Sequence, residues 1–305
     1  MTMIVGYAPD EHGNAALNLA GMLARSSGDD LVVSSVVPAP WLPGMARVDA
    51  EYHAYLDSTA DEALEVARGN LPDDLPARFV RHSARSAPAG LLELAEQYDA
   101  NMIVLGSSSA GVFGHIALGS VTDRLLHSSP LPIALSPRGL RTKPDARVTR
   151  VTAAYGGSAT AARMVVAAAR VAARLGASVR IASFAVWSRP AYTTRLGTDR
   201  EDLVLQEWIT DLEQKVNTAL EAVEELAEAP RKVEAVVGHG TNWADAIDDV
   251  GWESGDVLVI GSSRPGPVAR VFLGSRATKI VRDSPVPVVV VPREQPEEFA
   301  LGHSD

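Results

Sequence analysis

The 305-residue chain contains no cysteine, which excludes a disulfide framework, a thiolate metal site and a cysteine nucleophile. It also lacks any apolar run near the roughly 20 residues that a membrane span needs, so membrane insertion is not expected. Basic residues are fewer than acidic ones, 28 against 38, and the formal net charge is −10. Because nucleic-acid phosphates demand a basic surface, binding to DNA or RNA is not expected either. A strand-like run begins at Met3 and leaves no room for a signal peptide, which predicts a cytoplasmic protein.

One stretch of the sequence occurs twice, at a constant offset of 155 positions (261 − 106 = 155). A glycine-serine segment, a Gly-Ser pair and a Ser-Pro-x-Pro segment stand at 106–111, 119–120 and 129–132, and again at 261–266, 274–275 and 284–287. A period this long is a whole domain, and each half suffices for one compact core. We therefore predict a first domain over residues 1–137, a linker over 138–147, a second domain over 148–293 and a flexible tail over 294–305.

Within each half, apolar β-branched runs alternate with helical stretches rich in alanine and leucine. This alternation is typical of a parallel sheet with crossover helices, and it predicts five strands and four helices a half. The predicted strands are 3–7, 31–37, 78–81, 102–105, 133–135, 150–155, 178–184, 233–237, 257–260 and 286–291. The predicted helices lie near 14–26, 50–70, 88–98, 120–128, 159–175, 199–229, 243–253 and 275–282. Each half is thus an α/β domain with a five-stranded parallel sheet.

Gly106 and Gly261 each close a predicted strand and open a loop that leads to a helix. In an open parallel sheet, ligands bind beyond the carboxyl ends of the strands. Glycine lets backbone amides approach an anion, and the following helix N-terminus adds a favourable dipole. These two loops are therefore predicted phosphate cradles. They are not Walker A loops, since Val112 and Pro267 stand where lysine is required.

The same residues carry a resemblance to a known family. The pattern Gly-x2-Gly-x9-Gly-Ser, followed by a short helix and a Ser-Pro-x-Pro strand, is that of universal stress proteins, and segments 86–92 and 99–101 are also similar to that family. The resemblance covers nearly the whole chain, twice. It implies two consecutive Rossmann-like, adenine nucleotide alpha hydrolase-like domains that pair through their last strands, in cytoplasmic stress or dormancy responses. Some members of the family bind ATP and others do not.

The resemblance also implies where a nucleotide would bind, with its phosphates on the glycine loops and its base near the ends of the first two strands of each half. The implied phosphate residues are Gly106, Ser107, Ser109, Gly111, Gly119 and Ser120, and Gly261, Ser262, Arg264, Gly266, Gly274 and Ser275. The implied base residues are Tyr7, Ala8, Val36 and Val37, and Tyr155, Gly156, Phe184 and Ala185.

Both copies depart from the ATP-binding pattern. Ser109 and Arg264 replace the second glycine, and Ala8 and Gly156 replace the acidic residue of the first strand. If the second glycine needs a left-handed conformation, a side chain there costs about 1–2 kcal/mol. Arg264 would either block the cradle or pair with a phosphate. ATP binding and its absence both remain open.

Ser120 has two interpretations, as a phosphate contact and as the first residue of a capping box with Asp123. No histidine pair has metal-ligand spacing, no Ser/His/Asp set converges, and the adenylation motifs of related folds are missing, so no catalytic residue, metal site or enzyme is predicted. Two functions compete: a non-enzymatic stress protein that senses an adenine nucleotide, and a nucleotide-independent dimerising adaptor. Weak ATP hydrolysis ranks below both.

The last strand of each half, at 133–135 and 286–291, has edge groups that must be covered or paired. We therefore expect the two halves to pack as an intramolecular pseudo-dimer through these strands, with the 138–147 linker allowing the turn. Homodimerisation in addition is also expected.

Overall fold

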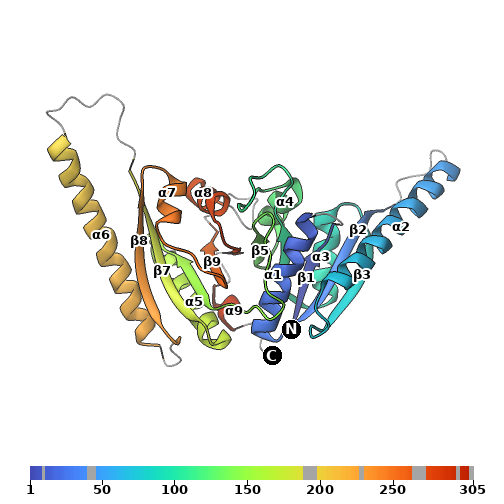
Figure 1. Cartoon of the computed structure of the whole chain (residues 1–305), viewed down its shortest axis with the longest axis horizontal. Coiled ribbons are helices and arrows are strands. Elements are labelled where there is room, and N and C mark those ends of the chain that lie inside the picture. The colour runs from blue at the N-terminus through green and yellow to red at the C-terminus, as the bar shows by residue number, and fades with distance from the viewer. Residues whose placement is uncertain are drawn as a thin grey trace. The chain divides into compact units, whose positions relative to one another are not determined.

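A computed structural model describes residues 1–8, 11–39, 46–187, 198–226, 230–262, 273–292 and 296–301 (Figure 1). The chain forms two compact units, one containing Met1–Arg147 and the other containing the described residues from Val148 to Leu301. None of the helices in the described ranges is both long enough and apolar enough to cross a membrane.

The first unit alternates strands and helices along the chain. Its elements are β1 (Thr2–Gly6), α1 (Glu11–Ser27), β2 (Asp30–Pro38), α2 (Ala46–Asn70), β3 (Ala77–Ala84), α3 (Ala87–Gln97), β4 (Ala100–Gly106), α4 (Ser120–Ser128) and β5 (Ile133–Ser136). The strands lie in the order β3-β2-β1-β4-β5, and every neighbouring pair is parallel. This arrangement confirms the predicted Rossmann-like α/β fold.

The second unit repeats this plan. Its elements are β6 (Arg150–Ala154), α5 (Ala159–Leu175), β7 (Ser178–Val186), α6 (Thr198–Glu224), β8 (Val233–Gly240), α7 (Trp243–Asp248), β9 (Asp256–Gly261), α8 (Ser275–Asp283), β10 (Val288–Val291) and α9 (Pro296–Leu301). The strands lie in the order β8-β7-β6-β9-β10, which corresponds strand for strand to β3-β2-β1-β4-β5 of the first unit. These neighbouring pairs are parallel as well. The duplication seen in the sequence is therefore a duplication of the fold.

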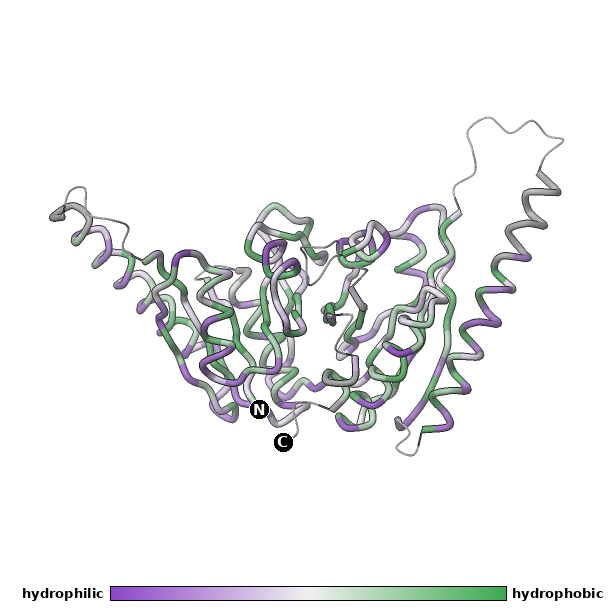
Figure 2. The backbone as a smooth tube through the Cα atoms, turned by 180° about the vertical axis from the view of Figure 1, so that it is seen from behind, coloured by the Kyte–Doolittle hydropathy of each residue, from purple (hydrophilic) through white to green (hydrophobic). Residues whose placement is uncertain are grey.

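The central strands form the core of each sheet. Ile4 on β1 pairs in register with Val32 on β2 and Ile103 on β4, and all three side chains are almost fully buried. Strands covered on both faces by crossover helices read as continuous apolar runs, as these do. The outer helices instead contain both polar and apolar residues along their length (Figure 2). On α6, Val216 and Val223 supply part of the buried stripe.

The Ser-Pro-x-Pro segments form the same turn in both units. The Ser129 hydroxyl donates to the Leu131 carbonyl and accepts from the Leu131 amide, both at 3.0 Å. Ser284 makes the same two bonds with Val286, at 2.8 and 3.3 Å. Both serines are completely buried. Each hydroxyl thus satisfies backbone groups that the flanking prolines leave without a ladder partner.

Two predicted boundaries are wrong for identifiable reasons. The strand expected from residue 286 begins at Val288, since the preceding prolines have no amide to donate. The helix expected over 243–253 ends at Asp248, and Gly251 follows with a φ of +70°, a conformation that ends helices. The described part of the predicted tail contains α9, which packs on α5 and accepts a hydrogen bond from Arg174 at the Ala300 carbonyl.

Candidate functional site

The candidate site lies where the crossovers of each sheet part to either side. In the first unit β1 lies between β2 and β4, so the switch point falls between the carboxyl ends of β1 and β4. Those ends lead to Tyr7-Ala8 and to the loop 107–119, which we call the glycine loop. Strand pairing therefore brings the predicted base and phosphate residues of the first unit to one edge of the sheet. The corresponding edge of the second unit lies between β6 and β9.

The base of the glycine loop is closed by hydrogen bonds. The amide of Ala117 donates to the Ser107 hydroxyl (2.8 Å), and the Ser108 amide donates to the Ala117 carbonyl (2.9 Å). Ser107 is buried, with 3% of its surface exposed. A Cβ added at Gly111 would lie 2.6 Å from the Cβ of Ala117, so glycine is required there for close approach. Ser107 and Gly111 therefore shape the loop from inside.

Ser109 occupies the position of the second glycine without strain. Asp99 is the sole non-glycine residue with a positive φ in the described ranges. Ser109 therefore does not adopt the left-handed conformation, and the penalty considered from the sequence does not arise. The substitution leaves the backbone of the first loop intact.

The capping-box interpretation of Ser120 is wrong. The N-cap of α4 is Gly119, and Ser120 is the first helical residue. A capping box would need the Asp123 amide to bond to the Ser120 hydroxyl, but that amide donates to the Gly119 carbonyl (2.8 Å). Ser120 is exposed, and its hydroxyl stands at the N-terminus of α4. In the second unit Gly274 is likewise the N-cap, and Ser275 begins α8.

The base side of the first unit is mostly closed by its own packing. Tyr7 is buried, and its hydroxyl donates to Asn14 on α1 across 3.4 Å. Val37 at the end of β2 is also buried, whereas Ala8 is exposed. Val36 packs against Gly90 of α3, where an added Cβ would lie 2.7 Å from its methyl group. The structure thus brings these residues to the expected edge, where Ala8 is exposed, Val36 is partly exposed, and Tyr7 and Val37 are buried.

The second unit is more open at the end of its first strand. Gly156 has no atom within 4 Å of an added Cβ, and Gly157 takes a φ of +75°. Ser158 caps α5 by accepting from the Ala161 amide at 3.2 Å. Tyr155 is partly exposed. Gly261 and Ser262 end β9 as expected, but Arg264 and Gly266 lie outside the described residues.

An aromatic pair, Phe184 on β7 and Trp243 on α7, marks the second unit. The Phe184 ring lies 6.4 Å from the Trp243 ring, centre to centre, and the Lys279 ammonium lies 5.9 Å from that of Trp243. Ala185, next along β7, is buried. Lys279 occupies the position in the second repeat that Arg124 occupies in the first (279 − 124 = 155), so each domain has a basic residue there.

Arg124 lines a cleft of about 440 Å³ between α3 and α4 of the first unit. Arg85 lines it as well, and both arginines are exposed. At the start of α3 the Ala89 amide is already bonded to the Ser86 hydroxyl. The cleft therefore offers exposed positive charge, but its Ser86 hydroxyl already accepts a backbone amide, and the glycine loop remains the better candidate.

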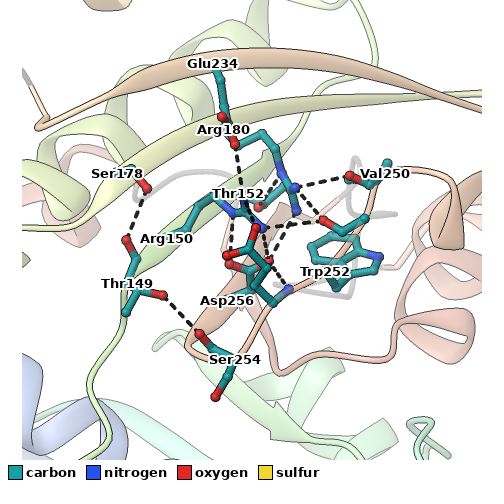
Figure 3. Close-up of polar contacts among 12 residues, drawn as sticks. Thr149, Arg150, Thr152, Ser178, Arg180, Glu234, Val250, Trp252, Ser254 and Asp256 are labelled. Atoms are coloured by element: carbon teal, nitrogen blue, oxygen red, sulfur yellow. Dashed lines mark hydrogen bonds and ion pairs between the residues drawn. The ribbon is translucent and has the colours of Figure 1, made fainter.

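A cluster of charged side chains lies in the second unit at the amino ends of β6, β7 and β9, opposite the candidate site (Figure 3). Asp256 is 1% exposed and accepts from Arg150 at 2.9 and 2.6 Å and from Arg180 at 3.5 Å. The bond to Asp256 raises the pKa of Arg150, whereas burial and the charge of Arg150 lower the pKa of Arg180. The Arg180 guanidinium also lies 4.7 Å from the Trp252 ring centre. Because this cluster sits at the amino ends of the strands, we assign it to stability.

Among the described residues, no three His, Asp or Glu side chains converge as a metal site. The arrangement at the glycine loop is instead suited to an anion. It combines an exposed serine hydroxyl, a helix N-terminus and a loop of small residues at a switch point.

Comparisons with known proteins agree with the fold and its duplication. The model of the Universal stress protein family matches residues 1–137 and 147–292. Universal stress protein Rv2319c of Mycobacterium tuberculosis is 37% identical over 297 residues, which are 96% of this chain and 100% of that protein. A universal stress protein from Archaeoglobus fulgidus has a similar structure, with a TM-score of 0.60 at 19% identity over 96% of this chain and 98% of that one.

Proposed function

Because the chain belongs to the universal stress protein family, we propose that it is a non-enzymatic stress-response protein that binds an adenine nucleotide, ATP in particular, in its first domain. The observation that carries this proposal is the position of Ser120. Its hydroxyl is exposed at the first turn of α4, beside a glycine loop at the switch point of the sheet. We place the phosphates of the nucleotide there.

The start of α4 supplies donors for such a phosphate. The first intrahelical bond runs from the Asp123 amide to the Gly119 carbonyl, so the amides of Ser120, Val121 and Thr122 have no acceptor within the helix. Unpaired amides and the helix dipole together favour an anion. Ser109 is unstrained, so the loss of the second glycine does not count against binding in this domain.

Two features weaken the nucleotide contacts. Ala8 supplies no carboxylate at the end of β1, so a ribose hydroxyl finds no charged acceptor there. Asp123 adds an acidic side chain to the first turn of α4, which repels a phosphate. We therefore expect modest affinity for ATP, with the phosphates contributing more than the sugar.

A nucleotide-independent adaptor is the second candidate, and one observation favours it. Val112 and Phe113, at the tip of the glycine loop, are 72% and 69% exposed. Large apolar side chains exposed together often mark a surface that another protein covers.

We also propose that β5 and β10, the last strands of their sheets, pair with each other within the molecule. We further propose that the protein forms a homodimer and that it is cytoplasmic.

The test is ATP binding measured by calorimetry on the wild type, on Gly119→Val and on Gly69→Val. A Cβ at Gly119 would lie 3.2 Å from the Cβ of Ser108, so valine narrows the cradle while its extended backbone tolerates the side chain. Gly69 has open space around an added Cβ and is the matched control. We expect Gly119→Val to weaken binding at least ~10-fold, about 1.4 kcal/mol, and Gly69→Val to leave it unchanged. Equal affinity in all three proteins would reject the site, and no binding to the wild type would favour the adaptor.

A further inference from the structure

We infer that Arg138, just after β5, is a positioning residue that clamps the glycine loop and couples its shape to the chain segment 138–142. The part of this inference that concerns a nucleotide rests on the function proposed above. The clamp itself does not, because it is made of contacts within the protein.

Arg138 contacts the glycine loop through its side chain and its backbone. The Nη1 atom donates to the carbonyls of Ser109 (3.1 Å) and Gly111 (2.7 Å). The Arg138 amide donates to the His115 carbonyl (2.9 Å), and its carbonyl accepts from the Gly114 amide (3.0 Å). Four hydrogen bonds from one residue therefore fix both limbs of the loop tip.

The residues that follow Arg138 continue this contact and then bind α1. Gly139 has a φ of +75°, and a Cβ added there would lie 2.1 Å from the ring of Phe113. The Leu140 carbonyl accepts from the Asn18 side chain (3.1 Å). Segment 138–142 thus lies against the loop tip at one end and against the helix that follows β1 at the other.

Among the described residues, no carboxylate pairs with the guanidinium of Arg138. Its described partners are carbonyl oxygens, and its Nε atom is buried without a hydrogen-bond partner. In a trans peptide the N–H points away from the carbonyl of the same unit. With the Ser109 and Gly111 carbonyls turned to Arg138, the amides of Ala110 and Val112 are turned away from it, and the Ala110 amide donates to the Ser108 hydroxyl (3.5 Å). The charge of Arg138 and the outward Val112 amide together favour an anionic ligand on the loop.

The repeat supplies an independent observation. Pro137-Arg138 recurs as Pro292-Arg293, at the offset that separates the two glycine loops (293 − 138 = 155). Arg293 lies outside the described residues, so its contacts are not assigned. An arginine nevertheless follows the last strand of each domain, in the same place relative to each loop.

Amide hydrogen exchange on the full-length protein tests the clamp without any ligand. Arg138→Ala keeps the two backbone bonds of residue 138 but removes the donor to the Ser109 and Gly111 carbonyls. Exchange should therefore speed up at least ~10-fold in peptides covering 109–115, because this part of the loop loses the side chain that holds it. Arg138→Gln, which keeps a donor but removes the charge, is a milder second variant in case the alanine variant folds poorly. Arg141→Ala is the control, since Arg141 is exposed and shows no hydrogen bond within the described ranges. Exchange at 109–115 that is the same in all four proteins would overturn the clamp.

ATP added to the same proteins tests the coupling. Because coupling is reciprocal, ATP should slow exchange in 138–142 of the wild type, and Arg138→Gln should weaken ATP binding ~10-fold while Arg141→Ala does not. A merely structural role would leave 138–142 unaffected by ATP. If ATP binds the wild type but neither effect is seen, the coupling is rejected. If ATP does not bind the wild type while the exchange effect of Arg138→Ala is present, the clamp stands and the proposed nucleotide site falls.

Discussion

The hydroxyl of Ser107 accepts a hydrogen bond from the amide of Ala117, ten residues further along the chain, at 2.8 Å. This bond joins the two ends of the glycine loop. Ser107 therefore has a structural role in the loop, independent of any contact with a ligand.

Ser107→Ala should destabilise the protein. The partly buried Ala117 amide would lose its acceptor. An unsatisfied buried amide costs about 1–3 kcal/mol, so we expect a loss near the lower end of this range. Urea unfolding measures the change, and Ser58→Ala, on an exposed face of α2, serves as the control with little expected effect. A Ser107→Ala protein as stable as the control would mean that water replaces the hydroxyl.

Asp256→Asn should destabilise the second domain more strongly. It removes the carboxylate that Arg150 and Arg180 share in a buried site, and breaking such a pair costs about 3–5 kcal/mol. Glu253→Gln is the matched control, because the Glu253 side chain also faces Arg150 but is 76% exposed. In the first domain, Asn101 stands at the position that corresponds to Asp256 (256 − 101 = 155). The first domain therefore has no equivalent carboxylate, and its unfolding should not change in the Asp256→Asn protein. An unchanged urea midpoint in the Asp256→Asn protein would contradict the assignment.

Acid should weaken the second domain partly through Glu234. Burial by itself raises the pKa of Glu234, but the hydrogen bond and charge of Lys232 and the charge of Arg150 outweigh it and lower the pKa below the ordinary 4.5. A carboxyl whose folded pKa is depressed adds stability above its unfolded pKa and loses it as pH falls through the folded one. The free energy of unfolding should therefore decline as pH drops below 4.5, and less steeply in Glu234→Gln. Parallel pH profiles for the two proteins would count against this contribution.

The proposed pairing through β5 predicts that a fragment of residues 1–140 dimerises. β5 has β4 on one side within its own sheet, and its apolar sequence makes an open edge unfavourable. Light scattering during gel filtration measures the mass across a concentration series. The Ile103 amide of β4 donates to the Pro132 carbonyl, so the alternate residue Leu135 turns its amide to the other side of β5. The same fragment with Leu135→Pro, which lacks this outward donor, should dimerise more weakly. A folded fragment that stays monomeric at millimolar concentration would argue against pairing by this strand.

The repeated motifs and the apolar alternation predicted the fold, because β-strands covered on both faces leave a strong pattern in the sequence. Most element ends fell within a few residues of the prediction. The capping of α4 was misjudged by one residue, since Gly119 and Ser120 are both acceptable N-caps and local pattern does not choose between them. The role of Arg138 was not predictable, because it depends on a contact between segments about 27 residues apart.

The buried turns at Ser129 and Ser284 have a consequence for regulation. Each serine directly precedes a proline, the local sequence that proline-directed kinases read. Both hydroxyls are fully buried and bonded to backbone groups two residues away, so a phosphate would have to break these bonds and bring about two negative charges into a buried turn. In the folded protein neither Ser-Pro site is therefore a substrate for phosphorylation, however well its sequence matches.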